Sequence, residues 1–122
     1  MKKCILIYDD DADILGVCKI ILENQNYRVE TRMLCDNIIK DIRQVKPDLI
    51  LMDLWIPGIG GENAIGLMKN NKATSHIPIF LFSANTEIEQ ISVRTNANGF
   101  LKKPFEVKAM LELIENNIPE IA

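Results

Sequence analysis

Four aspartates stand within five positions near the start of the chain, directly after an apolar run that ends at Tyr8. They are Asp9, Asp10, Asp11 and Asp13. Carboxylates this close repel one another, so one or more of them must take up a proton, a cation or solvent. A second apolar run, residues 49–52, also ends on an aspartate, Asp53. Two apolar runs that end in carboxylates indicate a site for a divalent metal ion.

Three carboxylates with open coordination positions suit a hard, oxygen-binding ion such as Mg²⁺, with Mn²⁺ as an alternative. We expect Asp10 and Asp53 to be direct ligands. Asp9 is expected to act through water, because neighbouring side chains on an extended segment diverge. Asp11 and Asp13 begin a helix, where the helix dipole favours their charges, and we expect no metal role for them.

Two further polar side chains follow apolar runs later in the chain. Ser83 comes after residues 77–82 and presents a hydroxyl, and Lys103 comes after residues 99–102 and presents an ammonium. A metal ion and Lys103 would neutralise phosphoryl oxygens, while Ser83 would donate to a third oxygen. A carboxylate among these groups can attack phosphorus and become an aspartyl phosphate.

A regular alternation of strands and helices must position these groups. Apolar runs predict five strands, and apolar residues at helical spacing predict five helices. The strands are expected at Lys3–Tyr8, Tyr27–Met33, Asp48–Met52, Ile77–Phe82 and Gly99–Lys102. The helices are expected at Ala12–Gln25, Asp36–Val45, Glu62–Asn71, Glu87–Thr95 and Glu106–Asn117. This alternation predicts an α/β fold with a parallel sheet, helices on both faces and right-handed crossovers.

The expected strand order, 2-1-3-4-5, reverses between the first and the third strand. These two strands end in Asp9-Asp10 and in Asp53. Ligands of open α/β sheets bind beyond the carboxyl ends of the strands, at such a reversal. The topology and the acid cluster therefore indicate the same place. The second strand is more polar than the others and is expected near an edge of the sheet.

The composition limits the kinds of protein that this chain can be. With 122 residues, 48% of them hydrophobic and 25% charged, it fits one globular domain over residues 1–122. The net charge of −3 argues against a basic surface for nucleic acid. No apolar run is long enough to span a membrane. The apolar stretch that ends at Tyr8 is too short for a signal peptide, so we expect a cytoplasmic protein.

The three cysteines and the single histidine carry no predicted chemistry. Cys4, Cys18 and Cys35 lie in or beside apolar segments and are expected to be reduced thiols, and no Cys-x-x-Cys spacing suggests zinc. His76 precedes Ile77-Pro78 in a loop and is expected at the surface, because no second histidine exists to build a site with it.

Together these residues resemble the receiver domain of bacterial two-component response regulators. The resemblance covers essentially the whole chain. It is carried by four segments in a fixed order, namely Ile5–Asp10, Pro47–Asp53 with Pro57-Gly58 behind it, Ser83-Ala84 and Lys103-Pro104-Phe105. It implies a flavodoxin-like (βα)5 doubly wound fold of five parallel strands, with no output domain in this chain.

The resemblance also implies the phosphoacceptor and the metal ligands. Asp53 would accept the phosphoryl group from a sensor histidine kinase or a histidine phosphotransfer protein. Asp9 and Asp10 would hold Mg²⁺ together with Asp53 and the backbone carbonyl of Trp55. Trp55 is larger than is usual at this position, and we expect it to slow the attack of water on the phosphoaspartate.

A further part of the resemblance concerns the response to phosphorylation. Ser83 would be the switch hydroxyl, Lys103 the phosphate-binding lysine, and Phe100 the aromatic switch residue. The Lys103–Pro104 bond would be cis. Phosphorylation would change the face made by the helix at 87–95, the strand at 99–102 and the helix at 106–117. That face would regulate a separate protein partner, with no direct contact to nucleic acid or membrane.

As a switch, the domain would catalyse only its own phosphotransfer and dephosphorylation. Three other functions are alternatives to this switch. A phosphatase of the haloacid dehalogenase type needs a general acid two residues after its nucleophile, where this chain has Trp55. A flavodoxin-like cofactor binder needs a phosphate loop rich in hydroxyls and glycine, where this chain has four aspartates. A degenerate receiver that binds partners without phosphorylation stays open because of Trp55, although the full set of reactive residues disfavours it.

Overall fold

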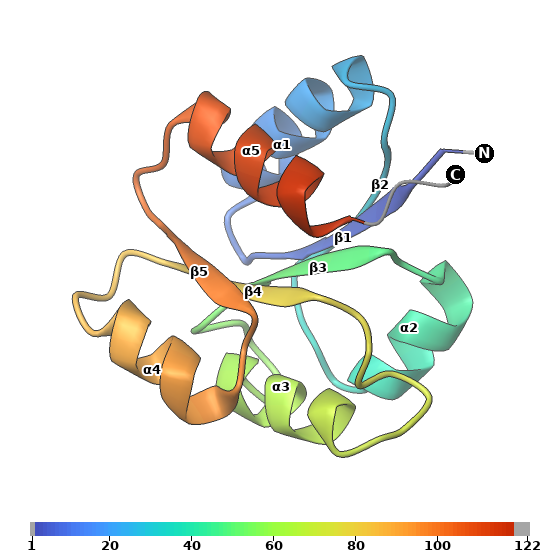
Figure 1. The fold of residues 1–122 in the computed structure, drawn as a ribbon, viewed down its shortest axis with the longest axis vertical. Coiled ribbons are helices and arrows are strands. Elements are labelled where there is room, and N and C mark those ends of the chain that lie inside the picture. Colours follow the sequence, from blue (N-terminus) through green and yellow to red (C-terminus); the bar gives the residue numbers. More distant parts are fainter. Residues whose placement is uncertain (1, 119–122) are drawn as a thin grey trace.

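The computed structural model describes residues 2–118 and confirms the predicted alternation of elements (Figure 1). The strands are β1 (Cys4–Tyr8), β2 (Arg28–Arg32), β3 (Leu49–Asp53), β4 (Ile79–Ser83) and β5 (Gly99–Lys102). The helices are α1 (Ala12–Asn24), α2 (Ile38–Val45), α3 (Gly61–Lys69), α4 (Ile88–Thr95) and α5 (Val107–Asn117). The strands form one parallel sheet in the predicted order β2-β1-β3-β4-β5, with the polar strand β2 at an edge.

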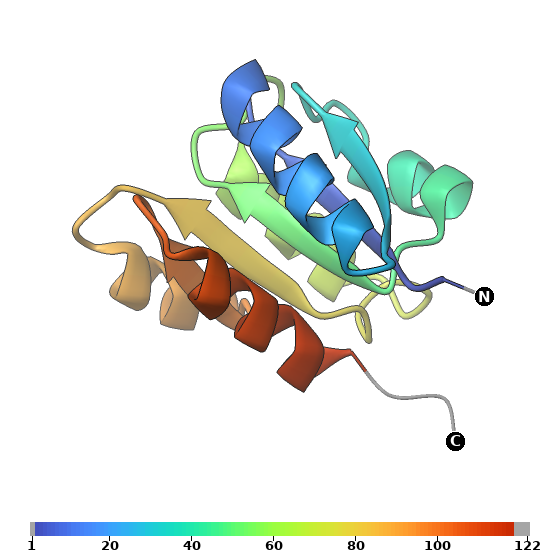
Figure 2. The ribbon, with the colours of Figure 1, turned by 90° about the horizontal axis from the view of Figure 1, so that it is seen from above.

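The helices form two layers on the sheet. Helices α1 and α5 cover one face, and α2, α3 and α4 cover the other (Figures 1 and 2). The inner strands are buried on both faces, which explains why they are continuous apolar runs rather than alternating ones. Along β1, Ile5 and Ile7 pack on the α1–α5 side, whereas Leu6 and Tyr8 pack on the α2–α4 side. This alternation decides where each side chain at a strand end points.

Side-chain and backbone caps set the ends of the helices. Asp11 caps α1, and its carboxylate accepts hydrogen bonds from two backbone N–H groups of the first turn. Asn37 caps α2 in the same way, so this helix begins at Ile38, two residues later than predicted. Lys46 ends α2 in the left-handed conformation, with φ +54°, immediately before Pro47.

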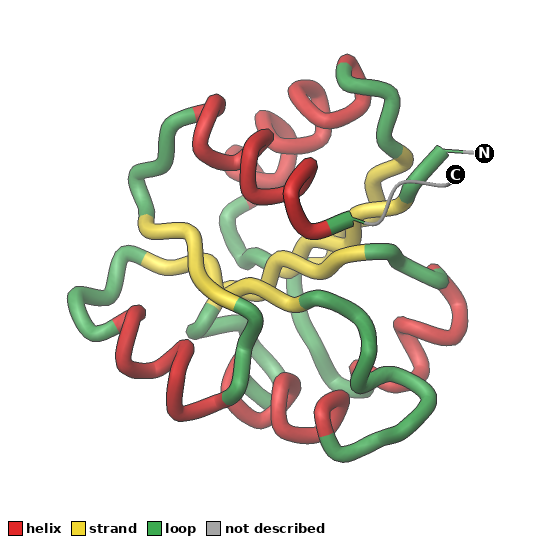
Figure 3. Tube along the Cα trace, viewed as in Figure 1, coloured by secondary structure: helices red, strands yellow, loops and turns green. Residues whose placement is uncertain are grey.

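The carboxyl ends of the strands share one edge of the molecule. The loops that follow β4 and β5 lie at the left of Figures 1 and 3. The Lys103–Pro104 bond, directly after β5, is cis, as the resemblance implied. Cys4, Cys18 and Cys35 are buried free thiols, and His76 is exposed, as predicted. In the described part of the chain, no helix combines the length and apolar character needed to cross a membrane.

Candidate functional site

Three carboxylates meet where β1 and β3 end. Asp9, Asp10 and Asp53 each offer one oxygen, and these oxygens lie within 4.8 Å of one another. Asp9 and Asp53 are buried and Asp10 is exposed. They meet because β1 and β3 are neighbours, with Tyr8 paired in register with Met52. The reversal of strand order thus places the acid cluster where the sequence predicted it.

Lys103 brings a positive charge into this cluster. Its Nζ atom lies 2.6 Å from Oδ2 of Asp9 and 3.5 Å from Oδ1 of Asp53. The side chain is only 17% exposed, so these ion pairs are screened less than surface pairs. The backbone N–H of Lys103 donates to the carbonyl of Ser83 at 2.9 Å, which joins the segment after β5 to the end of β4.

The charges of the site are unbalanced. Burial raises the pKa of Asp53 above its ordinary value, the Lys103 ammonium lowers it, and the charges of Asp9 and Asp10 raise it again. Burial disfavours the charged form of Lys103, but the hydrogen bond to Asp9 and the charge of Asp53 outweigh this and raise its pKa. Three carboxylates therefore face one ammonium, and a divalent cation would balance the excess negative charge.

The donor atoms fit a hard divalent ion. Both oxygens of Asp9 are already engaged, one by Lys103 and the other by the backbone N–H of Asp11 at 2.9 Å. Among the described residues, no hydrogen-bond donor engages the carboxylate of Asp10, and only Oδ1 of Asp53 lies near the Lys103 ammonium. At the end of β3 and just beyond it, the carbonyls of Asp53 and Leu54 accept backbone hydrogen bonds, whereas that of Trp55 accepts none within residues 2–118. A carbonyl and carboxylates form the all-oxygen ligand set that Mg²⁺ and Mn²⁺ prefer.

The loop after β3 is held by the loop between β2 and α2. The N–H of Cys35 donates to the carbonyl of Pro57 at 2.9 Å, and the N–H of Ile59 donates to the carbonyl of Cys35 at 2.8 Å. Between them, Gly58 has φ +98°, and a Cβ atom there would lie 2.2 Å from the Cys35 carbonyl oxygen. Only glycine fits this position, so the backbone beyond Asp53 is fixed.

Ser83 and Phe100 lie on the other side of the sheet. Ser83 ends β4 in the row of Ile79 and Leu81, which faces α2–α4, whereas Asp53 continues the row that faces α1 and α5. The Ser83 hydroxyl accepts a hydrogen bond from the backbone N–H of Asn85 at 3.1 Å. Phe100 is half-buried and packs in the α2–α4 layer. The structure thus joins Asp9, Asp10, Asp53 and Lys103 directly and leaves Ser83 engaged in its own loop.

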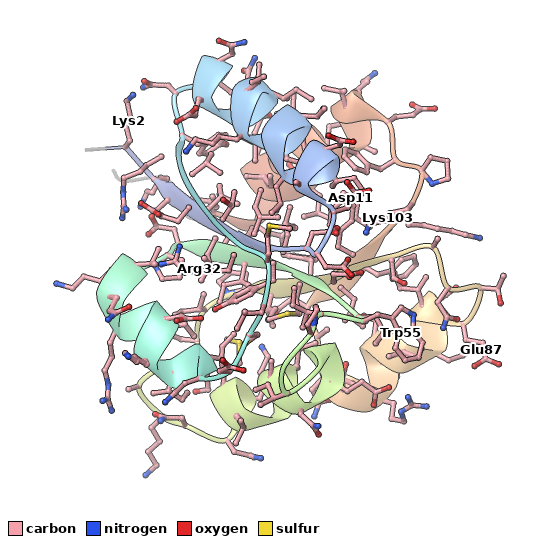
Figure 4. The ribbon with its side chains drawn as sticks, turned by 180° about the vertical axis from the view of Figure 1, so that it is seen from behind. Lys2, Asp11, Arg32, Trp55, Glu87 and Lys103 are labelled. Carbon is pink, nitrogen blue, oxygen red and sulfur yellow. The ribbon has the colours of Figure 1, made fainter. Side chains whose placement is uncertain are left out.

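The Trp55 side chain lies on the rim of this edge. It is 70% exposed, and Figure 4 shows it on the side of the molecule where Lys103 and Glu87 also lie. With Ile59 and Glu62 it lines an open hollow of about 350 Å³ beside the start of α3.

Sequence reasoning assigned no role to two aromatic side chains beside Lys103. The Phe82 ring lies beneath the ammonium, with its centroid 4.5 Å from Nζ. The ring of Phe105 packs edge-on against that of Phe82, at 5.1 Å between centroids. One signal was available: Phe82 immediately precedes Ser83 on a strand beside β3, and in the sheet it pairs in register with Asp53.

Comparison with known proteins identifies related sequences and structures. A family model described as the response regulator receiver domain matches residues 5–115. The DNA-binding response regulator MtrA of Mycobacterium tuberculosis is 29% identical over 115 residues, covering 91% of this chain and 48% of MtrA. The chain spans about half the length of such curated relatives.

Solved structures show the same fold. The chemotaxis response regulator CheY4 of Vibrio cholerae superposes with a TM-score of 0.84 at 22% identity, covering 97% of this chain and 100% of that one. The receiver domain of NtrX from Brucella abortus gives a TM-score of 0.82 at 25% identity, covering 93% of this chain and 96% of that one.

Proposed function

Because this chain belongs to the response regulator receiver domain family, we propose that Asp53 accepts a phosphoryl group and drives a phosphorylation-dependent signalling switch. The observation that carries the proposal is the position of the Lys103 ammonium, 2.6 Å from Asp9 and 3.5 Å from Asp53, beside the three-carboxylate cluster. A nucleophile, a phosphate-binding cation and metal-binding acids thus share one edge of the sheet.

In the proposed reaction, an oxygen of Asp53 attacks the phosphorus of a phosphohistidine. The donor is a sensor histidine kinase or a histidine phosphotransfer protein. A P–O bond forms while the P–N bond of the donor breaks, and the departing imidazole takes up a proton. Lys103 already lies near Asp53 and would bind an oxygen of the arriving phosphoryl group.

The chain's own residues would hold Mg²⁺, or Mn²⁺ in its place. We assign Asp10, Asp53 and the carbonyl of Trp55 as ligands. Asp9 acts through water, since both of its oxygens are engaged by protein donors. The bound ion supplies positive charge to the carboxylates and the phosphoryl oxygens. The exposed carboxylate of Asp10 gives the ion access from solvent.

The switch would begin at Ser83. A phosphoryl group on Asp53 brings about −1.5 to −2 charges. The Ser83 hydroxyl would then give up its hydrogen bond from the Asn85 N–H and donate a hydrogen bond to the phosphoryl group. The loop after β4 would follow, and Phe100 would move into the vacated space. An exposed ion pair between Arg94 of α4 and Glu62 of α3, at 2.7 Å, links α4 to its neighbour. Such a pair is weak, so the face made by α4, β5 and α5 can change.

The changed face would act on a protein partner. Some relatives are named as DNA-binding, and this chain corresponds to about half their length. We propose that residues 1–122 form one receiver domain and that this domain signals by contact with another protein. The cytoplasmic location of the protein stays a prediction. A phosphorylation-independent interaction module is the alternative, but it gives no role to the Lys103 ion pairs or the carboxylate cluster.

Intact mass spectrometry after incubation with acetyl phosphate tests the proposal. We expect one phosphoryl adduct per chain in Mg²⁺ and none in a chelator. A chain that takes no phosphoryl group from acetyl phosphate or from a phosphorylated histidine donor would support the interaction module instead. Trp55 fluorescence on adding Mg²⁺ with beryllofluoride gives a second, phosphate-free readout, because this residue lies two positions from Asp53.

A further inference from the structure

We propose that Phe82 positions the Lys103 ammonium through the face of its aromatic ring. The face of the ring attracts the ammonium, and the ring itself cannot be protonated and does not bind metal. This inference deepens the function proposed above and rests on it, because it concerns the lysine assigned to phosphate binding.

The geometry is that of a cation–π contact. The Nζ atom of Lys103 lies 4.5 Å from the Phe82 ring centroid, within the distance of about 6 Å over which such contacts act. Phe82 is fully buried, so little water competes for the ring face. Its register pairing with Asp53 puts both side chains on the α1–α5 side of the sheet.

Phe105 fixes the orientation of that ring. Its ring meets the Phe82 ring at an interplanar angle of 65° and a centroid distance of 5.1 Å, the edge-to-face arrangement favoured by aromatic pairs. Phe105 follows Lys103 by two residues. The same segment therefore carries both the ammonium and the Phe105 ring that orients Phe82.

The ring supplies what the other partners of Lys103 do not. Asp9 and Asp53 attract the ammonium, but both belong to the acid cluster and would share their charge with a bound cation. A further carboxylate beneath Lys103 would add to the repulsion within that cluster. An aliphatic side chain would fill the space without attracting the charge. The negative face of a neutral aromatic ring attracts the ammonium and adds no charge.

Phe80 provides a matched comparison. It lies two residues before Phe82 on the same strand and in the same buried cluster, facing α1 and α5. In the described residues it makes no cation–π contact. Changes that affect only core packing should act alike at the two positions, whereas changes in ring electrons should matter only at Phe82.

The test replaces Phe82 site-specifically with mono-, di- and trifluorophenylalanine, which withdraw electrons from the ring face with little change in size. The rate of phosphorylation by acetyl phosphate in Mg²⁺ is measured for each protein. We expect a stepwise decrease of about two- to tenfold across the series. The same series at Phe80 should show no trend. A flat series at Phe82, or equal decreases at both positions, would overturn the proposal.

A second readout does not depend on phosphorylation. In the metal-free protein, the ring current of Phe82 should shift the ε-methylene protons of Lys103 upfield in the NMR spectrum. Phe82→Leu should abolish that shift, and Phe80→Leu should keep it. If the native chain accepts no phosphoryl group, the proposed function fails. The NMR spectrum still tests the contact between Lys103 and the Phe82 ring. Lys103 ε-methylene resonances at the ordinary lysine position in the native chain would refute the contact between the ammonium and the Phe82 ring.

Discussion

The ammonium of Lys103 lies 2.6 Å from Oδ2 of Asp9, a residue 94 positions earlier in the chain. The contact links the segment after β5 to the end of β1, and β3 and β4 lie between these two strands in the sheet. This contact holds the Lys103 ammonium near Asp53, whose carboxylate oxygen we assign as the nucleophile.

Replacing Lys103 by alanine should uncouple phosphorylation from the conformational change. The Lys103→Ala variant keeps Asp53 and the metal-binding acids, so it should still gain a phosphoryl adduct in Mg²⁺. It lacks the charge that binds the phosphoryl oxygens, so the amide NMR signals of α4, β5 and α5 should not shift. The control is Lys102→Ala, which removes an exposed neighbouring lysine and should behave as the native chain. A full shift in Lys103→Ala would contradict the assigned role.

Removing Asp10 should abolish tight Mg²⁺ binding. Loss of groups that only support metal ligands already weakens binding by about 10–100-fold, so Asp10→Ala should weaken it at least tenfold. Titration of Trp55 fluorescence with Mg²⁺ measures the change. Asp13→Ala, which removes an exposed charge in the first turn of α1, should bind as the native chain does. Equal affinity in Asp10→Ala and the native chain would remove Asp10 from the site.

The loop beyond Asp53 should tolerate no side chain at Gly58. A Cβ atom there would lie 2.2 Å from the Cys35 carbonyl oxygen, at φ +98°. We expect Gly58→Ala to lower the free energy of unfolding by roughly 2–4 kcal/mol. Gly16→Ala, in α1 with nothing within 4 Å, should raise it by up to about 1 kcal/mol. Urea denaturation measures both, and a harmless Gly58→Ala would show that the loop is not fixed as described.

Burial of Cys35 should make stability fall at high pH. Burial, followed by the charge of Asp41, raises the thiol pKa from 9.0 to about 11. Below pH 9 the thiol is protonated in both states and contributes no pH dependence. Between pH 9 and 11 only the unfolded chain loses the proton, so stability falls, by up to about 2 kcal/mol for this group. The fall should be smaller in Cys35→Ala by urea denaturation at pH 8, 9.5 and 10.5, and identical slopes would contradict it.

The elements, the strand order and the acid cluster could all be predicted from sequence. Continuous apolar runs predicted strands buried on both faces, and the strand-helix alternation predicted the parallel sheet. Once the order is 2-1-3-4-5, Asp9 and Asp53 must end neighbouring strands. The positions of the elements depend on local patterns, whereas the strand order belongs to the flavodoxin-like fold that the resemblance implies.

Contacts between distant side chains could not be predicted in this way. The sequence of α1 offers two adjacent apolar stripes, and only the packing of the sheet shows that Leu15 and Cys18 are buried while Val17 is exposed. The hydroxyl of Tyr8 donates to Asp41 of α2 at 2.6 Å, a pair 33 residues apart. The Phe82 ring beneath Lys103 likewise depends on side-chain directions at two strand ends, and one-dimensional spacing does not specify these directions.

The most direct test of the central claim locates the phosphoryl group. Borohydride reduces an aspartyl phosphate to homoserine, so the native chain is phosphorylated with acetyl phosphate in Mg²⁺, reduced, digested and sequenced by mass spectrometry. We predict homoserine at position 53 only, and none in Asp53→Asn or in a chelator. Homoserine at Asp9 or Asp10, or a stable phosphoryl adduct on Asp53→Asn, would contradict the assignment of Asp53 as the phosphoacceptor.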